Sequence, residues 1–253
     1  TYRDGKTKRA SVRKRMPRCI KDYLIILSAG LCFSTAVPAI PPSGPGHFNL
    51  LSRASSVQLE SQLSKVQRQW LQNKRELVLG TAFPDYPPFD LTSSGRDYEG
   101  LTADYAGLLS KALALPVKVL RYPSREAAIR ALEAGDIDLL GSSNGFEAAN
   151  LNLILSEPYA VDRPVLVTRE GETRSLSDGL AGMRLALVYH YLPLGEVEKL
   201  YPEAIIRAYP SYQNALNAVA FDQADVFLGD TISTHYMINK GYLKNIRMAN
   251  FGK

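Results

Sequence analysis

Cysteine is almost absent from this chain of 253 residues, and its two cysteines, Cys19 and Cys32, both lie near the amino terminus. Nothing after Cys32 can form a disulfide or a thiol-based site, so an exported domain of this composition depends on its hydrophobic core. Histidine is scarce too. The three histidines, His47, His190 and His235, lack the spacing of zinc ligands.

Motifs of the common enzyme classes are also missing. The sequence contains no G-x-S-x-G, no P-loop and no G-x-G-x-x-G. Asp138, Glu147 and Asp230 could be combined into a carboxylate pair, but nothing in the sequence requires one. We therefore expect a noncatalytic chain that needs neither a cofactor nor a metal.

Positive charge is concentrated at the amino terminus. The formal net charge is +5, but residues 1–39 contribute +7, which leaves −2 for the remainder. A basic stripe interleaved with aromatic residues, as nucleic-acid binding requires, does not occur later in the chain. The composition therefore predicts no nucleic-acid partner.

The basic residues introduce a segment with the organisation of a signal peptide. They precede a short apolar stretch, Tyr23 to Phe33, and the small residues of "STAVPA" follow it. This order predicts a secretory signal peptide over residues 1–39, cleaved after Ala39, because the apolar stretch is short for a membrane span. An uncleaved amino-terminal anchor is the alternative. Either interpretation places the rest of the chain in the periplasm.

A linker and an amphipathic helix are expected over residues 40–75. "PAIPPSGPG" has the Pro/Gly content of a linker. In the following segment, apolar residues occur at i, i+4, i+7 and i+11, namely Leu59, Leu63, Val66 and Trp70. Ser55 and Gln58 have the spacing of a capping box. The apolar stripe predicts a helix that docks on the domain or on a partner.

From Leu77 onward, strand and helix patterns alternate. The expected strands are 77–81, 117–122, 137–143, 163–169, 184–189, 204–209 and 224–230, and the expected helices are 101–114, 124–135, 195–201, 212–223 and 233–241. Ser124 and Gly135 fit the N-cap and the stop of the second helix. This alternation predicts an α/β fold of two units with parallel sheets, in which ligands bind beyond the carboxyl ends of the strands.

Five stretches carry a family resemblance. "LVLGTAFPDYPPFD", "YEGLTADYAGLL", "AAIRALEAGDIDLL", "LSEPYAVDRPVLV" and "NALNAVAFDQADVFLGD" are similar to the successive landmarks of bacterial family 3 extracellular solute-binding domains, the Venus flytrap type. The lead-in "QRQWLQNKRELVLG" resembles the flytrap domains of Bvg/Evg-type hybrid sensor histidine kinases. The resemblance implies a first lobe over 76–167, a second lobe over 168–246 and a return crossing that starts at 247–253.

The same resemblance implies a function and partners. The chain is expected to be a periplasmic solute-sensing domain that transmits lobe closure across the membrane to a histidine kinase. It looks like a fragment or truncated product of a longer sensor with further flytrap, membrane and kinase segments, which is expected to be a homodimer. A small-molecule ligand is the expected partner of the cleft. A solute-binding subunit of an ABC uptake transporter and the regulatory domain of a lytic transglycosylase are the alternatives.

Candidate ligand-binding residues follow from matching positions in the family. Tyr86 lies in the proline-rich turn after the first strand, where Phe89 is expected to pack in the core. The turn after the third strand carries Ser142, Ser143 and Asn144. Asp230 stands where amino-acid binders hold the ligand's ammonium group, although it also fits a helix N-cap.

The sequence departs from the amino-acid binders at two places. Those proteins carry an arginine that clamps the ligand's carboxylate, but no arginine occurs here between Arg130 and Arg163. Their small lobe-two turn is replaced by Tyr189-His190-Tyr191. Arg125 could supply an anion contact from an unusual position. We expect a ligand of another class, for instance a cation or an aromatic acid, or else a cleft that binds nothing and transmits only its shape.

Overall fold

The computed structural model describes residues 44–55, 63–151, 153–189, 192–240 and 243–249, which belong to one compact unit spanning residues 42–253. The predicted signal peptide therefore lies outside the described residues, as do Gln58 and Leu59 of the predicted helix. Within the described ranges, no helix is both long enough and apolar enough to cross a membrane.

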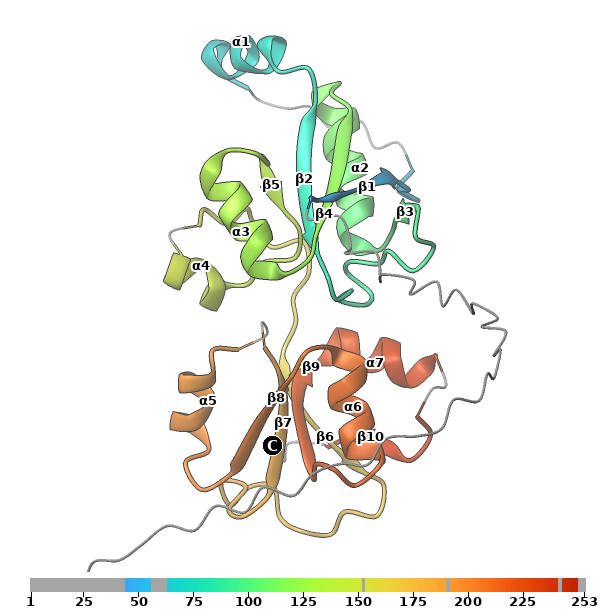
Figure 1. Cartoon of the computed structure of the whole chain (residues 1–253), viewed down its shortest axis with the longest axis vertical. Helices are drawn as coiled ribbons and strands as arrows, with labels where there is room; N and C mark the ends of the chain where they lie inside the picture. Colours follow the sequence, from blue (N-terminus) through green and yellow to red (C-terminus); the bar gives the residue numbers. More distant parts are fainter. Residues whose placement is uncertain (1–43, 56–62, 152, 190–191, 241–242, 250–253) are drawn as a thin grey trace, which may run out of the picture. The chain divides into compact units, whose positions relative to one another are not determined.

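The first of two five-stranded sheets has the order β3-β1-β4-β2-β5 (Figure 1). Its strands are β1 (Gly46–Leu50), β2 (Leu77–Ala82), β3 (Asp97–Tyr98), β4 (Val117–Tyr122) and β5 (Leu139–Leu140). β2 pairs in parallel with β4 and β5, whereas β1 runs antiparallel to β4. The sheet is thus mixed: the predicted parallel pairing is confirmed for β2, β4 and β5, and β1, which was not predicted, joins it antiparallel. We call this sheet, with the helices packed on it, lobe 1.

The second sheet has the order β10-β6-β9-β7-β8 and forms lobe 2 with its helices. Its strands are β6 (Pro164–Arg169), β7 (Arg184–Val188), β8 (Ile205–Tyr209), β9 (Val226–Asp230) and β10 (Ile246–Met248). β7 is parallel to β8 and β9, but β6 runs antiparallel to β9 and to β10. This sheet is mixed in the same way.

Helices cover both faces of each sheet, which explains the apolar runs of the strands. In lobe 1, α2 (Leu101–Leu113) packs over Leu79 of β2 and Val119 of β4. On the other face, α3 (Arg125–Ala134) packs over their chain neighbours Val78 and Leu120. Successive side chains of a strand point to opposite faces, so a strand covered on both faces is apolar throughout.

Lobe 2 repeats this arrangement. Its helices are α5 (Leu194–Leu200), α6 (Tyr212–Ala220) and α7 (Thr231–Asn239). Val165 and Val167 of β6 share a core with α6 and α7, while Leu166 between them joins the core under α5. Both cores are built almost entirely from aliphatic and aromatic side chains, as expected for a domain without disulfides.

The same three-residue stretch, Tyr-Pro-Ser, begins one helix in each lobe. In lobe 1, Ser124 caps α3 after β4, and its hydroxyl accepts a hydrogen bond from the backbone N–H of Ala127. In lobe 2, Ser211 caps α6 after β8 in the same way, with Asn214 as donor. The predicted cap at Ser124 and stop at Gly135 are confirmed, because Gly135 has the left-handed conformation.

Strand β1 corrects the linker prediction. Residues 40–75 were expected to hold only a linker and a helix, yet Gly46–Leu50 pairs with both β3 and β4 inside the first sheet. The strand was missed because glycines and prolines surround it and because its residues alternate only weakly between exposed and partly buried.

The lobe boundaries need two corrections. The predicted boundary after Val167 falls within β6, and the whole of β6 lies in the second sheet. The predicted return crossing from residue 247 falls within β10, which pairs with β6. We therefore place the first crossing before Pro164. The local sequence of a strand does not show which sheet the strand joins, so the boundary could not be read from β6 itself.

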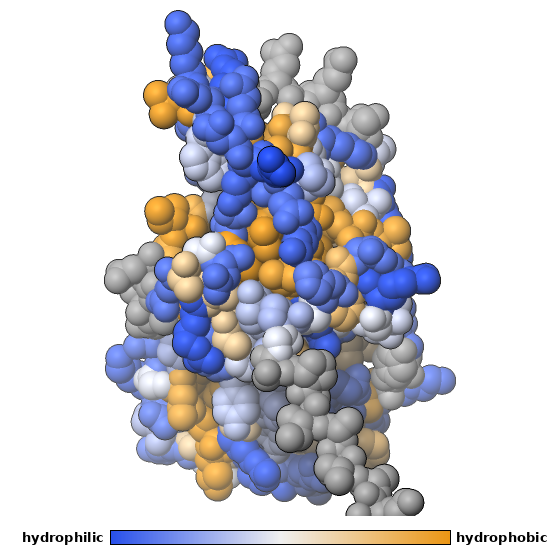
Figure 2. Space-filling model, turned by 45° about the horizontal axis from the view of Figure 1, so that its top comes forward, coloured by the Kyte–Doolittle hydropathy of each residue, from blue (hydrophilic) through white to orange (hydrophobic). Residues whose placement is uncertain are grey.

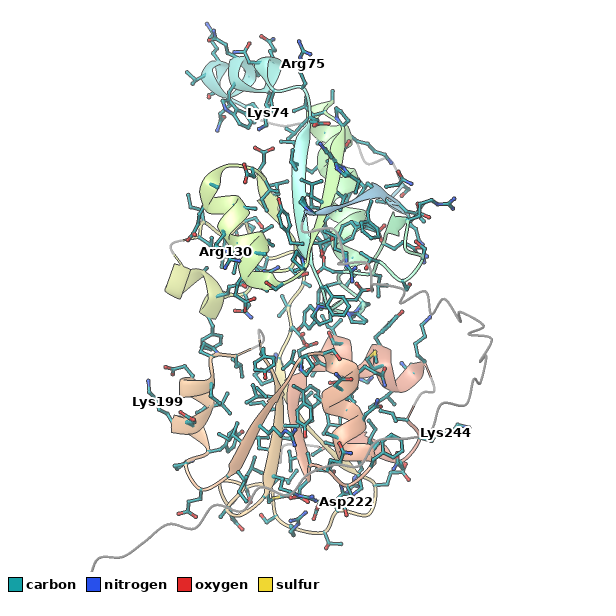
Figure 3. All side chains as sticks on the ribbon, viewed as in Figure 1. Lys74, Arg75, Arg130, Lys199, Asp222 and Lys244 are labelled. Carbon is teal, nitrogen blue, oxygen red and sulfur yellow. The ribbon has the colours of Figure 1, made fainter. Side chains whose placement is uncertain are left out.

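The described amphipathic helix is more exposed than predicted. Helix α1 (Lys65–Asn73) begins with a capping box formed by Ser64 and Gln67, and none of its residues is buried. Trp70 is 54% exposed. Lys74, labelled in Figure 3, ends the helix and forms an ion pair with Asp138. The prediction that this helix docks on its own domain is therefore wrong for the described residues, and docking on a partner remains the other prediction.

Apolar side chains also reach the surface elsewhere in the described residues. Ile154 is 99% exposed and Val161 is 81% exposed. Figure 2 shows apolar areas on one face, set among hydrophilic residues. Isolated exposed apolar side chains are ordinary in soluble proteins and need no partner to explain them.

Candidate functional site

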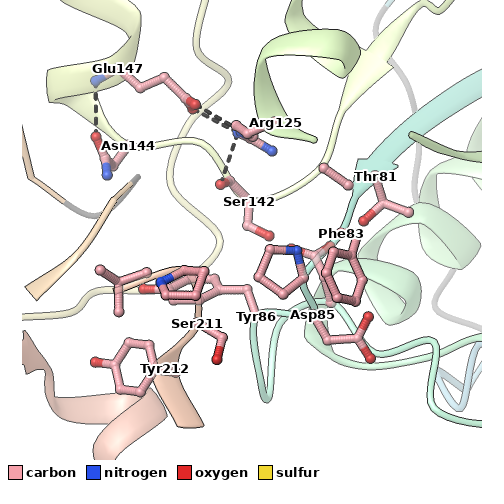
Figure 4. A pocket seen from close by; sticks show the side chains of 15 residues that line it. Thr81, Phe83, Asp85, Tyr86, Arg125, Ser142, Asn144, Glu147, Ser211 and Tyr212 are labelled. Carbon is pink, nitrogen blue, oxygen red and sulfur yellow. Dashed lines mark hydrogen bonds and ion pairs between the residues drawn. The ribbon is translucent and has the colours of Figure 1, made fainter. Parts of the chain in front are cut away.

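A cavity of about 80 Å³ lies at the carboxyl ends of strands from both sheets (Figure 4). Lobe 1 contributes Phe83 after β2 and Ser142 after β5, and lobe 2 contributes Ser211 after β8. This is the edge at which open α/β sheets bind ligands. The cavity is small, since pockets for drug-sized ligands measure about 300–1,000 Å³.

Tyr86 and Asp230 join the two lobes at this cavity. The Tyr86 hydroxyl donates a hydrogen bond of 2.5 Å to Oδ2 of Asp230, which also accepts one of 2.7 Å from the Tyr212 hydroxyl. The other oxygen, Oδ1, accepts from the backbone N–H of Ser233 and caps α7. Asp230 thus confirms the predicted helix cap with one oxygen and forms an interlobe contact with the other. Binding of a ligand's ammonium group by Asp230 stays a prediction.

The carboxyl of Asp230 has an unusual electrostatic environment. Burial raises the pKa of Asp230 to about 6, and the neighbouring carboxyl of Asp162 raises it further, while the hydrogen bond from Tyr86 opposes the rise. Burial alone would raise the pKa of Asp162 too, but a hydrogen bond with the Asp230 carboxyl, together with hydrogen bonds from Thr231 and Ile232 at the start of α7, lowers it. At pH 7 both carboxyls therefore favour the ionised form.

Arg125 at the start of α3 is held by acceptors of its own lobe. Its Nε donates to Oε1 of Glu147 at 2.7 Å and its Nη2 to Oε2 at 2.6 Å, a bidentate pair drawn in Figure 4. Further bonds reach the carbonyl oxygens of Gly141 and Ser142 and the hydroxyl of Ser143. The Arg125 and Glu147 side chains are each only 11% exposed.

Asp90 is a third buried carboxyl, on the lobe 1 wall of the cavity. Burial raises the pKa of Asp90 to about 6, against the lowering effects of the hydrogen bond from the Tyr98 hydroxyl and of the positive charge of Arg125. Gly141 is adjacent, and a side chain there would press its Cβ within 2.9 Å of Oδ1 of Asp90. The glycine therefore allows the close packing of this polar cluster.

The structure brings most of the candidate residues together. The cavity is lined by four of them, Tyr86, Arg125, Ser142 and Asn144. Ser143 contacts Arg125 and lines a wider groove of about 1580 Å³ beside the cavity. Phe89 is buried as predicted and stacks on Tyr86 with ring centroids 5.4 Å apart.

Tyr189 is the residue of the predicted aromatic turn, Tyr189-His190-Tyr191, that the structure describes. Tyr189 follows β7 and is 59% exposed, and it is not among the described residues that line the cavity. His190 and Tyr191 lie outside the described residues. A ligand-binding role for this turn stays a prediction.

Sequence reasoning missed Tyr212, Asp162 and the pairing of Glu147 with Arg125. Glu147 lies on α4 (Gly145–Leu151), a helix that the alternation pattern does not predict. A signal was present: Asn144 accepts a hydrogen bond from the backbone N–H of Glu147, and Asn followed three residues later by Glu is an N-terminal helix pattern. Tyr212 had no comparable signal, because only the fold brings it to Asp230.

The site is suited to binding a small molecule by hydrogen bonds and aromatic contacts. Tyr86 and Tyr212 pack with centroids 5.7 Å apart, and both direct their hydroxyls to Asp230. Among the described residues, no group of three or more His, Cys, Asp or Glu side chains is arranged to hold a metal.

Two α/β lobes with a cavity at the carboxyl ends of their strands define a periplasmic binding-protein-like domain. A family model for bacterial extracellular solute-binding proteins, family 3, matches residues 77–245. The chain belongs to this family.

Two relatives that share most of this chain are sensor proteins. The chain is 42% identical over 226 residues to the virulence sensor protein BvgS of Bordetella bronchiseptica, covering 89% of this chain and 18% of BvgS. It is 26% identical over 190 residues to the sensor protein EvgS of Escherichia coli O157:H7, covering 75% of this chain and 16% of EvgS. The chain thus spans less than a fifth of the length of these relatives.

Solved structures of BvgS are similar to this chain as well. The crystal structure of the BvgS periplasmic domain of Bordetella pertussis matches with a TM-score of 0.69 and 42% identity, over 81% of this chain and 40% of that one. The VFT2 domain of the same protein matches with a TM-score of 0.66 and 25% identity, over 74% of this chain and 79% of that one. The fold is a two-lobed Venus flytrap, as the sequence resemblance implied, and its relatives support a periplasmic sensor domain.

Proposed function

We propose that this chain is the periplasmic sensing segment of a longer two-component sensor histidine kinase, and that movement of its lobes is transmitted across the membrane. The kinase segment, the membrane span, further flytrap domains and a homodimeric state belong to this proposal. The chain itself is proposed to be noncatalytic, exported by its signal peptide and responsive to a small molecule in the cleft.

The observation that carries the proposal is the 42% identity to BvgS along 89% of the chain. The interlobe bond between Tyr86 and Asp230 supplies an element that a ligand could bias, because a ligand shifts an equilibrium by its differential affinity for the two states. A ligand in this cleft would meet these two side chains as the lobes separate or close.

A transporter subunit is the second candidate. The arginine-binding periplasmic protein of Mannheimia haemolytica is 26% identical over 58% of this chain, a weaker match than that to BvgS. The regulatory domain of a lytic transglycosylase has no comparable support. The gene distinguishes these candidates: a membrane span and a histidine-kinase segment are expected after Lys253, whereas an end within about 60 residues, enough to close one lobe, contradicts the sensor proposal.

The direct test measures kinase output in the full-length protein. Tyr86→Phe removes the hydroxyl that bonds to Asp230, and we expect it to change autophosphorylation in membranes at least several-fold without changing protein level. Tyr105→Phe is the matched control, because Tyr105 lies exposed on α2. Equal autophosphorylation in wild type and both variants would count against signalling through lobe closure.

A further inference from the structure

The positive charge that lines the cavity belongs to Arg125, and Arg125 is already paired with a carboxylate of the same chain, that of Glu147. Among the described residues that line the cavity, Arg125 is the single cation. Its guanidinium meets Glu147 through two parallel hydrogen bonds of 2.7 and 2.6 Å. This fork-to-fork geometry is the one in which an arginine binds a free carboxylate.

The remaining donors of Arg125 are largely used as well. Nη1 donates to the Gly141 carbonyl at 2.7 Å, and Nη2 also reaches Ser143 Oγ at 2.9 Å. Little of the guanidinium is left to meet a ligand. Both partners of the pair are about nine-tenths buried, so an incoming carboxylate would have to displace Glu147 and leave it unpaired in a buried place, which is strongly unfavourable.

The position of Glu147 favours the internal carboxylate further. Glu147 lies on α4, whose first turn is fixed by the Asn144 side chain, so the carboxylate is held beside Arg125 without any loss of translational freedom. A free carboxylate loses that freedom on binding. The tethered carboxylate of Glu147 therefore binds Arg125 more favourably than a free carboxylate of the same chemistry.

We propose that Glu147 is a built-in anion that fills the carboxylate-binding position of Arg125, so that the cleft selects against ligands that carry a carboxylate. This inference rests on the proposed function in that the cleft admits a small molecule, and it narrows that molecule to one without a carboxylate. The polar and aromatic groups of Tyr86, Tyr212 and Asp230 then provide the contacts for such a ligand.

Glu147→Ala tests the proposal with acetate as the probe. The substitution removes the atoms of an acetate group, so free acetate is expected to bind Arg125 in the variant. We expect thermal unfolding of the whole chain at pH 7 to shift upward saturably when sodium acetate replaces sodium chloride at equal ionic strength. The expected rise is about 3–5 °C at ten times the apparent dissociation constant. Wild type is expected to show no such rise.

Glu99→Ala is the matched control, because Glu99 pairs with Arg53, whose side chain is 76% exposed. Its midpoint is expected to be the same in both salts. A midpoint of Glu147→Ala that does not respond to acetate, or a wild type that responds equally, overturns the proposal. If Glu147→Ala does not fold in chloride, recovery of native circular dichroism in acetate supports the proposal, and failure in both salts overturns it. Kinase output plays no part in these measurements, so the proposed function stands or falls separately.

Discussion

Asp230 has no exposed surface and accepts hydrogen bonds from both lobes and from the helix it caps. The titratable groups that face it are Tyr86, Tyr212 and Asp162. Burial raises its pKa to about 6, so the folded protein holds the proton more tightly than the unfolded chain does. The stability gained in this way is full below the ordinary pKa of 3.8 and is lost as the pH rises through 6.

We predict that Asp230→Asn weakens this pH dependence. Asp90 has a pKa raised to about 6 as well, so wild type is expected to lose stability between about pH 4 and pH 6 from both groups. Without the titration of Asp230, the loss of unfolding free energy between pH 4 and pH 6 should be smaller by about 2–3 kcal/mol. Urea unfolding at a series of pH values from 4 to 7.5 measures it.

The control for this experiment is Asp178→Asn, at an exposed position of lobe 2. Its pH profile is expected to follow that of wild type. A decline between pH 4 and pH 6 that is equally steep in Asp230→Asn would show that the Asp230 carboxyl does not titrate as inferred.

The secondary structure elements were largely predictable wherever they carry strong periodicity and clear ends. Strands β2 and β4 to β9 and helices α2, α3, α5, α6 and α7 occur where the alternation predicts them, whereas the short strands β3 and β10 are not predicted. Elements were missed where the signal is short. β1 lies among glycines and prolines, and α4 spans only seven residues. Such elements are stabilised by the partners they meet, which the local sequence does not reveal.

At this scale we predict that the two Tyr-Pro-Ser caps contribute equally. Ser124→Ala and Ser211→Ala each remove one side-chain acceptor of a helix N-terminus and should lower the free energy of unfolding by about 1 kcal/mol. Chemical denaturation measures both. Ser93→Ala, at an exposed turn position, is the control, and its unfolding free energy is expected to stay within about 0.5 kcal/mol of wild type. Loss at only one of the two caps would show that the caps are not equivalent.

For the molecule as a whole, the contact between Tyr86 and Asp230 connects residues that are 144 positions apart in the chain. A hydrogen bond to a charged group contributes about 1.5–3 kcal/mol. A contribution of this size shifts the equilibrium between two lobe arrangements roughly 10-fold to 150-fold.

We predict that Tyr86→Phe shifts the lobes toward separation in solution. The radius of gyration from small-angle X-ray scattering should increase relative to wild type, because the interlobe bond is lost while the ring and its stacking on Phe89 are retained. Tyr105→Phe should leave the radius unchanged. An unchanged radius for Tyr86→Phe would mean that this hydrogen bond does not set the lobe arrangement.

The sequence by itself determined the α/β class, the two lobes, the family and the turns in which the cleft residues lie, because apolar periodicity and turn chemistry are local properties. Four residues that the sequence predicted for the cleft, Tyr86, Arg125, Ser142 and Asn144, line the cavity, and their contact with a ligand stays a prediction. Only the tertiary structure decided what those residues meet there. Arg125 is paired with Glu147, and Asp230 with two tyrosines, one of them from the other lobe, because hydrogen-bond partners depend on how the chain brings distant strand ends together.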